Sequence, residues 1–337
     1  MALATPTHIS DTTGILCCYR FHPAEGSRAL DAAEAERRLL EPREPEPGEF
    51  LWLHLNLSHA GSEKWLRRHG LLSAEFHELL HEGTRSTRID YADDSLLAVI
   101  NDVLFDFSFD TQEISTLYLC VRPHLAITAR SKPLRSIDRL REAVKRGDLL
   151  DSPVDLLVHL LRDQADVLIQ ISRELADAVD SVEDRLLVNR LERKPAQLGA
   201  WRRLLVRLQR LMAPEPSALF RLLNRPPAWV SESDVRALRQ STEEFSTVLR
   251  DMLTLQERIK LLQEEIAALT NEQTNRSLFV LTVISVMVLP INIISGLLGM
   301  NVGGIPLAGT TDGFWIVVAL VATLTAVAAW FAFRERE

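Results

Sequence analysis

The sequence predicts a three-part membrane protein. An α/β domain is expected over residues 1–150, a stalk of long helices over residues 151–276, and a hairpin of two transmembrane helices over residues 277–337. Residues 14–147 alternate short apolar runs of period two with short helical stretches. Helical periodicity dominates from Pro153 onward. No Asp, Glu, Lys or Arg lies between Arg276 and Asp312, or between Asp312 and Arg334.

The N-terminal domain is predicted from its alternating pattern. Strands are expected over residues 15–19, 51–57, 95–107, 114–121 and 125–129. Helices are expected over residues 28–40, 62–68, 73–81 and 134–145. The proline-rich run at residues 42–50 is expected to form a loop. Both kinds of element in one segment predict an α/β or α+β domain.

Prolines divide the first part of the stalk into helices. Pro153 is well placed at a helix start, so one long helix is expected over residues 153–189. A second helix is expected over residues 195–211, followed by a shorter helical stretch to residue 224. The breaks between and after these helices fall at Pro214, Pro216, Pro226 and Pro227.

The last stalk helix is expected to continue into the membrane. Ser233 and Asp234 can cap a helix, and no Pro or Gly follows them until Pro290. A helix of this length is rarely found alone, which favours packing against neighbouring helices. The apolar seam expected to make these contacts consists of Leu255, Ile259, Leu262, Ile266 and Leu269.

Two apolar segments, residues 277–298 and 314–333, are long enough to cross a bilayer. At about 1.5 Å rise per residue, each spans a hydrocarbon core of about 30 Å. Arg276 precedes the first segment, Arg334 and Arg336 follow the second, and the connecting loop contains neither Lys nor Arg. The positive-inside rule therefore predicts a multi-pass protein of the cytoplasmic (inner) membrane with both termini in the cytoplasm. The N-terminal residues lack the basic and apolar regions of a secretory signal.

Composition narrows the functional classes. The formal net charge of −8 argues against nucleic acid as a partner. The three cysteines, Cys17, Cys18 and Cys120, form neither an even set nor a C-x-x-C pair. Buried thiols in a reducing compartment fit this pattern. No resident cofactor is expected.

The first span carries a stripe of mostly small and polar residues at steps of three and four. Its members, here called the stripe, are Asn275, Leu278, Thr282, Ser285, Leu289, Asn292, Gly296 and Gly299. Polar groups at membrane depth usually face protein or a water-filled cavity, whereas small residues also serve tight helix packing. Asn275 and Asn292 favour a water-filled path, with Leu289 as an apolar constriction and Pro290 as a possible bend. Two spans cannot enclose such a path, so several copies would have to assemble.

The tripeptide Gly299-Met300-Asn301 follows the first of the two C-terminal spans. At this position the sequence resembles the CorA family of divalent-metal transporters. The longer string GLLGMNVGGIPLAG, followed by FWIVVAL, is similar to the zinc-transporting branch of that family. The resemblance covers the whole layout of the chain, is strongest over residues 275–333, and extends to residues 174–187 and 203–214.

The resemblance implies a funnel-shaped homopentamer whose long helix continues as the pore-lining span. Gly299, Met300 and Asn301 would form a selectivity loop at the outer mouth, where Asn301 side chains and backbone carbonyls meet a hydrated cation. Magnesium-type members usually have an aromatic residue after the motif and an acid in the loop. Here residues 302–306 read VGGIP and the first acid is Asp312, which favours Zn²⁺ as the transported ion. The zinc branch often varies the residue at Met300, so a Mg²⁺, Co²⁺ or Ni²⁺ channel is the alternative.

A second metal motif lies in the N-terminal domain. His77, Glu78 and His81 match the H-E-x-x-H pattern, which on a helix places two imidazoles on one face. The alternatives are a membrane-anchored zinc enzyme, a regulatory zinc site at His77 and His81, and an ordinary amphipathic helix. No third ligand motif follows, so the chain is not expected to be an enzyme. A receptor or scaffold with a plain hairpin anchor is a third alternative.

Acidic residues gather on the stalk helices. Asp177, Asp180, Glu183 and Asp184 share one helical face, and Glu257 and Glu264 share another with Asn271. These acids could attract cations toward the inner end of a pore. The alternative for the first group is a solvated surface balanced by Arg173 and Arg185.

Overall fold

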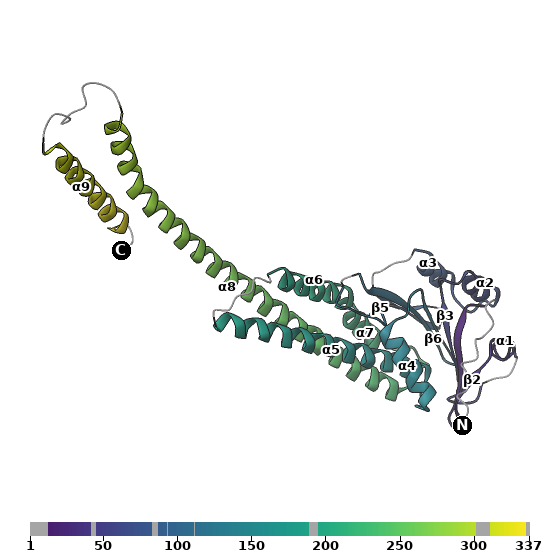
Figure 1. Ribbon diagram of the computed structural model, residues 1–337. Coiled ribbons are helices and arrows are strands. Elements are labelled where there is room, and N and C mark those ends of the chain that lie inside the picture. Colours follow the sequence, from purple (N-terminus) through teal and green to yellow (C-terminus); the bar gives the residue numbers. More distant parts are fainter. Residues whose placement is uncertain are drawn as a thin grey trace, which may run out of the picture. The chain divides into compact units, whose positions relative to one another are not determined.

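The computed structural model describes residues 13–41, 45–82, 87–92, 94–110, 112–188, 195–300 and 311–334. The chain divides into two compact units, Met1–Leu262 (unit 1) and Gln263–Glu337 (unit 2). Unit 1 contains the sheet and most of the helices (Figure 1). Asn301 and the loop that follows it lie outside the described residues.

A mixed seven-stranded sheet forms the centre of unit 1. Its strand order is β2-β1-β3-β7-β6-β5-β4. Strands β3 and β7 pair in parallel, and the other neighbours are antiparallel. The strands are β1 (Ile15–His22), β2 (Gly26–Leu30), β3 (Phe50–Asn56), β4 (Arg88–Ala92), β5 (Ser95–Val103), β6 (Ile114–Arg122) and β7 (Leu125–Arg130).

Both faces of the sheet are buried by helices, so each strand contributes to two cores. In β6, Leu119 packs on one side and Cys120 on the other. Helices α1 (Ala32–Leu40), α2 (Ala60–Arg68) and α3 (Ala74–Glu82) cover the Cys120 side (Figure 1). Helices α4 (Arg135–Arg146) and α5 (Pro153–Leu187) cover the Leu119 side. This double burial explains why the central strands read as nearly continuous apolar runs.

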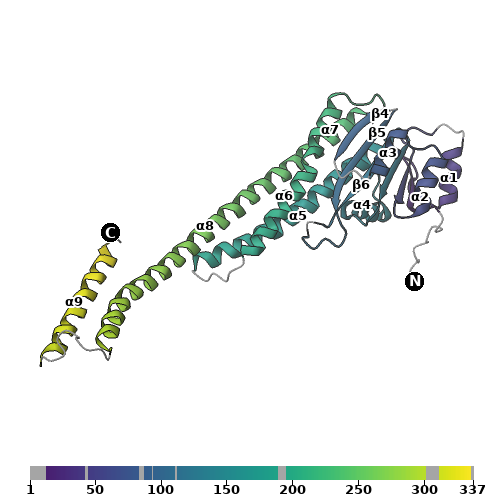
Figure 2. The ribbon, with the colours of Figure 1, turned by 90° about the horizontal axis from the view of Figure 1, so that it is seen from above.

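Helix α6 (Pro195–Met212) and the first part of α8 (Glu232–Leu298) lie along α5, and α7 (Pro214–Asn224) packs on β4. Ser152 caps α5, because its hydroxyl accepts a hydrogen bond from the Asp155 N–H at 3.0 Å. Figure 2 shows α5 and α6 beside the first part of α8. Buried residues recur every seven positions along this part of α8, at Leu238, Phe245, Met252 and Ile259.

Several sequence-based expectations for unit 1 are confirmed and two are wrong. The break at Pro214 and the burial of Leu255 and Leu262 in the apolar seam are confirmed. The helix expected over residues 28–40 begins only at Ala32, because Gly26, with φ of +80°, turns the chain into strand β2. Strand β4 was not expected from the sequence. Both missed strands lie at the edges of the sheet, where one-sided burial weakens the pattern.

Unit 2 consists of the C-terminal part of α8 and of α9 (Gly313–Arg334). Helix α8 is long and apolar enough to cross a membrane, and α9 contains a shorter apolar stretch, Gly313–Val327. The helix continues through Pro290 and ends at Leu298, where the first span was expected to end. Apolar side chains such as Leu281 and Ile284 are exposed on α8, as expected for a surface that faces lipid.

Candidate functional site

The motif tripeptide begins where α8 ends. The Gly299 N–H donates to the Ser295 carbonyl oxygen at 2.9 Å, which closes the last helical turn. A Cβ atom at Gly299 would lie 3.0 Å from that oxygen, so a side chain here would crowd the turn. Met300 is 48% exposed. The structure thus places Gly299 and Met300 directly after the stripe-bearing helix, and Asn301 lies outside the described residues.

The stripe follows one exposed face of a single helix, α8. Thr282 Oγ1 donates to the Leu278 carbonyl at 2.8 Å, and Ser285 Oγ donates to the Leu281 carbonyl at 2.9 Å. Each hydroxyl proton is therefore used within the helix, so the hydroxyl oxygen can still accept. Oxygen lone pairs of this kind can meet a cation or the water around it. Stripe residues Asn275 and Asn292 are exposed as well.

The His77 and His81 pair lies on α3, but the described surroundings do not form a metal site. His81 Nε2 lies 2.6 Å from Glu63 Oε1 and 2.6 Å from an Arg67 nitrogen, both on α2. Burial and the charge of Arg67 lower the pKa of His77. Across the described ranges, no group of three His, Cys, Asp or Glu side chains is placed to hold a metal ion. His81 therefore joins α3 to α2, and His77 Nδ1 is buried without a hydrogen-bond partner among the described residues.

Arg258 of α8 binds two of the four acids on α5. Its guanidinium lies 2.5 Å from Asp180 Oδ1, and it contacts Glu183 at 2.9 Å and 2.5 Å. These bonds raise the pKa of Arg258. The sequence suggested that Arg173 and Arg185 supply the positive charge beside these acids. At Asp180 and Glu183 it comes instead from Arg258, about seventy-five residues further along the chain.

The remaining acids differ in their pairing. Glu257 lies 3.5 Å from Lys260, one turn along α8. Asp177, Asp184 and Glu264 are exposed and form no ion pair within the described parts of the chain. Of the six acids that could attract cations, these three therefore keep an uncompensated negative charge in the described structure.

Replacement of Arg258 by glutamine is expected to loosen the distal end of α5. Backbone hydrogen exchange of the helical turns around Asp180 and Glu183 should rise, because both carboxylates lose their shared donor. The unfolding midpoint should change little, since exposed ion pairs contribute about 0–1 kcal/mol. Hydrogen-exchange mass spectrometry of the purified protein measures this. Lys260→Gln, which breaks only a pair within α8, is the matched control, and equal exchange in both variants would contradict the assignment.

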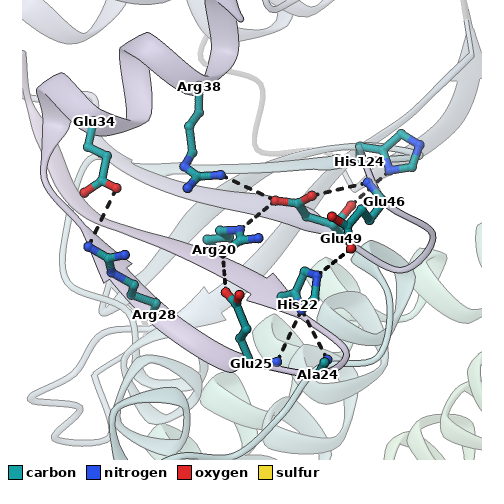
Figure 3. A network of polar contacts seen from close by, with 10 residues as sticks. All are labelled: Arg20, His22, Ala24, Glu25, Arg28, Glu34, Arg38, Glu46, Glu49 and His124. Atoms are coloured by element: carbon teal, nitrogen blue, oxygen red, sulfur yellow. Dashed lines mark hydrogen bonds and ion pairs between the residues drawn. The ribbon is translucent and has the colours of Figure 1, made fainter. Parts of the chain in front are cut away.

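A second polar network, which the sequence did not predict, lies at the β1 and β2 edge of the sheet (Figure 3). Arg20 is 7% exposed and donates to Glu49 and Glu25, each at 2.6 Å. Burial acts to lower the pKa of Arg20, but the bonds to Glu49 and Glu25 raise it on balance. Arg38 of α1 reaches the same Glu49 oxygen at 3.5 Å.

Two histidines complete this network. His22 Nε2 lies 2.9 Å from Glu46, and His124 Nδ1 lies 2.9 Å from the Glu49 carbonyl oxygen. A small pocket of about 230 Å³ lies beside Arg38, Glu49 and His124. Each carboxylate drawn in Figure 3 has a basic partner, so the network ties the β1–β2 hairpin to α1 and β3. It shares no residue with the motif or the stripe.

Known proteins related to this chain match most of its length. The family model described as CorA-like Mg²⁺ transporter protein matches residues 47–334. The divalent cation transporter CmaX of Pseudomonas aeruginosa is 31% identical over 296 residues, covering 86% of this chain and 87% of CmaX. The zinc transport protein ZntB of Yersinia enterocolitica is 25% identical over 282 residues, covering 83% of this chain and 85% of ZntB.

Solved structures share the fold. The structure of full-length CmaX has a TM-score of 0.81 at 26% identity, and the match covers 97% of this chain and 99% of that one. The CorA magnesium transporter of Methanocaldococcus jannaschii has a TM-score of 0.73 at 19% identity, covering 94% and 97% of the two chains. The family model and the CmaX relative each extend over more than two thirds of the chain. The chain therefore belongs to the CorA-like Mg²⁺ transporter family, and it is a membrane transporter of divalent cations rather than an enzyme.

Proposed function

We propose that the chain forms a funnel-shaped homopentamer that carries Zn²⁺ across the cytoplasmic membrane, with both termini in the cytoplasm. The observation that supports this most strongly is the continuity of α8. One helix begins in unit 1, carries the stripe along its apolar part and ends directly before the Gly299-Met300-Asn301 motif. Copies of α8 around an axis would present the stripe oxygens to a shared water-filled path.

The motif and the stripe suit different steps of transport. Small divalent ions give up water reluctantly, so a ring of neutral Asn301 amides would hold the hydrated ion without a large dehydration cost. Thr282 and Ser285 would then offer oxygen acceptors, and Leu289 would form an apolar constriction. The unpaired acids Asp177, Asp184 and Glu264 would raise the local cation concentration at the inner end.

Two observations favour Zn²⁺ and two favour another divalent ion. Residues 302–306 lack an aromatic or acidic side chain, and several relatives are named zinc transport proteins. The second candidate is a Mg²⁺, Co²⁺ or Ni²⁺ channel. It is supported by Met300, and by the description of the matching family model as a Mg²⁺ transporter. No Asp, Glu, Lys, Arg or His lies from Ser277 to Thr311, so any coupling to protons would need groups outside this segment.

Metal flux into liposomes that contain the purified protein tests the proposal. Zn²⁺ and Mg²⁺ are compared, with and without a pH gradient, after light scattering has established the oligomer. Zinc flux is the expected result, and a response to the pH gradient would add proton coupling. Magnesium flux alone would overturn the zinc assignment but keep the pore, and no flux from verified pentamers would overturn both.

A leucine series separates a pore from a plain membrane anchor. Leucine at Thr282, Ser285 and Asn292 should remove flux, because the path would lose its oxygen acceptors. Val283→Leu, on the other face of the same helix, serves as the control and should retain flux. An anchor for a receptor or scaffold would tolerate both changes equally.

A further inference from the structure

Two buried carboxyl groups in the core of unit 1 take no part in the ion path. Glu215 lies in the first turn of α7, is fully buried, and has no hydrogen-bond partner at either carboxylate oxygen among the described residues. Asp102, near the end of β5, is 1% exposed. The charged group that acts on Glu215 is Asp102, which carries the same sign. A buried carboxylate without donors or a cation is costly, so the pair requires an explanation.

The two carboxyl groups have opposite surroundings. Asp102 accepts hydrogen bonds from the Ser136 N–H at 2.8 Å, the Ser136 hydroxyl at 3.0 Å and the Val103 N–H at 2.8 Å. Ser136 lies in the first turn of α4, where the helix dipole also favours an anion. Glu215 has no comparable donors, and α7 follows α6 with only Ala213 between them. Negative charge is therefore better accommodated on Asp102.

Gln164, which is bonded to the residue next to Asp102, adds an acceptor rather than a donor. Gln164 of α5 donates from Nε2 to the Asn101 carbonyl at 2.8 Å, next to Asp102. Its own Oε1 is buried without a partner among the described residues. Leu219 of α7 packs in the same hydrophobic cluster as residues of β5, α5 and α8. A proton on Glu215 would remove one buried charge and supply one hydrogen-bond donor.

We propose that Asp102 and Glu215 form a proton-binding site, in which Glu215 holds the proton at neutral pH and Asp102 holds the negative charge. Burial, and then the charge of Asp102, raise the pKa of Glu215 well above its ordinary range. Burial raises the pKa of Asp102 to about 6, against the hydrogen bonds from Ser136 and Val103. Two like charges in a dry core therefore retain one proton at neutral pH and take a second in acid.

Other charged groups near this core do not neutralise Glu215. On α5, the charge of Asp163 acts on Asp102 and further raises its pKa. The pKa of Asp163 is itself raised to about 6, first by burial, while Arg139 and His159 oppose this. On the other packed elements, Arg88 of β4 pairs with Asp90, Arg210 of α6 is exposed, and Asp234 of α8 is hydrogen-bonded. Arg207 of α6 is partly buried and its Nε has no hydrogen-bond partner among the described residues, but the charge that acts on Glu215 is that of Asp102.

Because of this site, the free energy of unfolding should fall as the pH rises. A carboxyl whose pKa is raised in the folded state stabilises the fold below its ordinary pKa, and this contribution is lost as the pH rises through the raised value. Packing of α7 on the sheet should therefore weaken as Glu215 loses its proton. Leu238 of α8 lies in the same hydrophobic cluster as Leu219 of α7. Protonation of Glu215 should therefore also affect the packing of the first part of α8.

Infrared spectroscopy of the full-length protein in detergent tests the site directly. At about pH 8, Asp102 and Asp163 are ionised, so a carbonyl band of protonated carboxylic acid should come from Glu215. The band should be present in the natural protein and absent from Glu215→Gln, which keeps the shape and removes the acid. Glu257→Gln, at an exposed carboxylate of α8, is the matched control and should retain the band. Absence of the band from the natural protein, or its persistence in Glu215→Gln, would overturn the proposal.

Thermal unfolding supplies a second test that separates a proton from a metal ion. The midpoint of the natural protein should fall more steeply than that of Glu215→Gln as the pH rises from about 7 to 9. Addition of Mg²⁺ or Na⁺ should affect the two proteins equally. If either ion instead stabilises only the natural protein, a bound cation rather than a proton satisfies Glu215, and the proposal is wrong.

Discussion

Replacement of Asn301 by alanine is expected to abolish divalent-cation flux while leaving the oligomer intact. Asn301 completes the motif that begins at Gly299, directly after α8 ends. In the proposed pentamer its amides are the first protein groups to meet the hydrated ion. Methyl groups cannot offer oxygen dipoles, so the entering cation would meet an apolar ring. Liposome flux should fall by at least about tenfold, equivalent to about 1.4 kcal/mol in ion binding.

An asparagine outside the ion path gives the control for this variant. Asn224→Ala, at the exposed end of α7, makes the same chemical change and should transport normally. Light scattering of both variants should show the same oligomer. Normal uptake by Asn301→Ala would defeat the motif as the entry site, even if the protein still transports cations by another route.

The elements assigned to the proposed ion path are those that the sequence predicted best. The uncharged stretch after Arg276 and the absence of Gly before Gly296 are local features, so the end of α8 at Leu298 followed from them. Pro290 does not stop the helix. Proline removes one backbone donor, and a long helix with regular turns before and after Pro290 can continue through the loss.

The contacts that the sequence did not predict depend on residues far apart in the chain. The Arg258 bonds to Asp180 and Glu183 form only because α8 packs along α5, and no local pattern distinguishes Arg258 from other arginines. Glu215 follows a proline at a helix start, where an acid is ordinarily solvent-facing. Its burial results from the joint packing of α7, β5 and α8, which only the structure shows.

Asp138→Asn is expected to destabilise unit 1 strongly. Asp138 of α4 is 14% exposed at its side chain and binds two guanidinium groups, Arg130 at 3.1 Å and Arg141 at 2.6 Å. Arg130 in turn donates to the fully buried His54 at 3.0 Å. Burial, and then the charge of Arg130, lower the pKa of His54 well below its ordinary value, so His54 is neutral and offers no compensating charge.

Asparagine at position 138 keeps the shape of the site but leaves two partly buried arginines without a counter-charge. Breaking a buried ion pair costs about 3–5 kcal/mol. For a unit of this size, that corresponds to a fall of about 10 °C in the midpoint of thermal unfolding. Circular dichroism of the purified protein measures this value.

The neighbouring pair on the same helix shows why burial decides the outcome. Glu142 binds Lys145 at 2.8 Å, closer than Asp138 binds Arg130, yet both side chains are about half exposed. Exposed pairs contribute about 0–1 kcal/mol, so Glu142→Gln should leave the midpoint nearly unchanged. Similar midpoints for the two variants would show that water reaches Arg130 and Arg141. The polar cluster between α4 and the sheet would then be a hydrated surface rather than part of the core that positions α5 and α8.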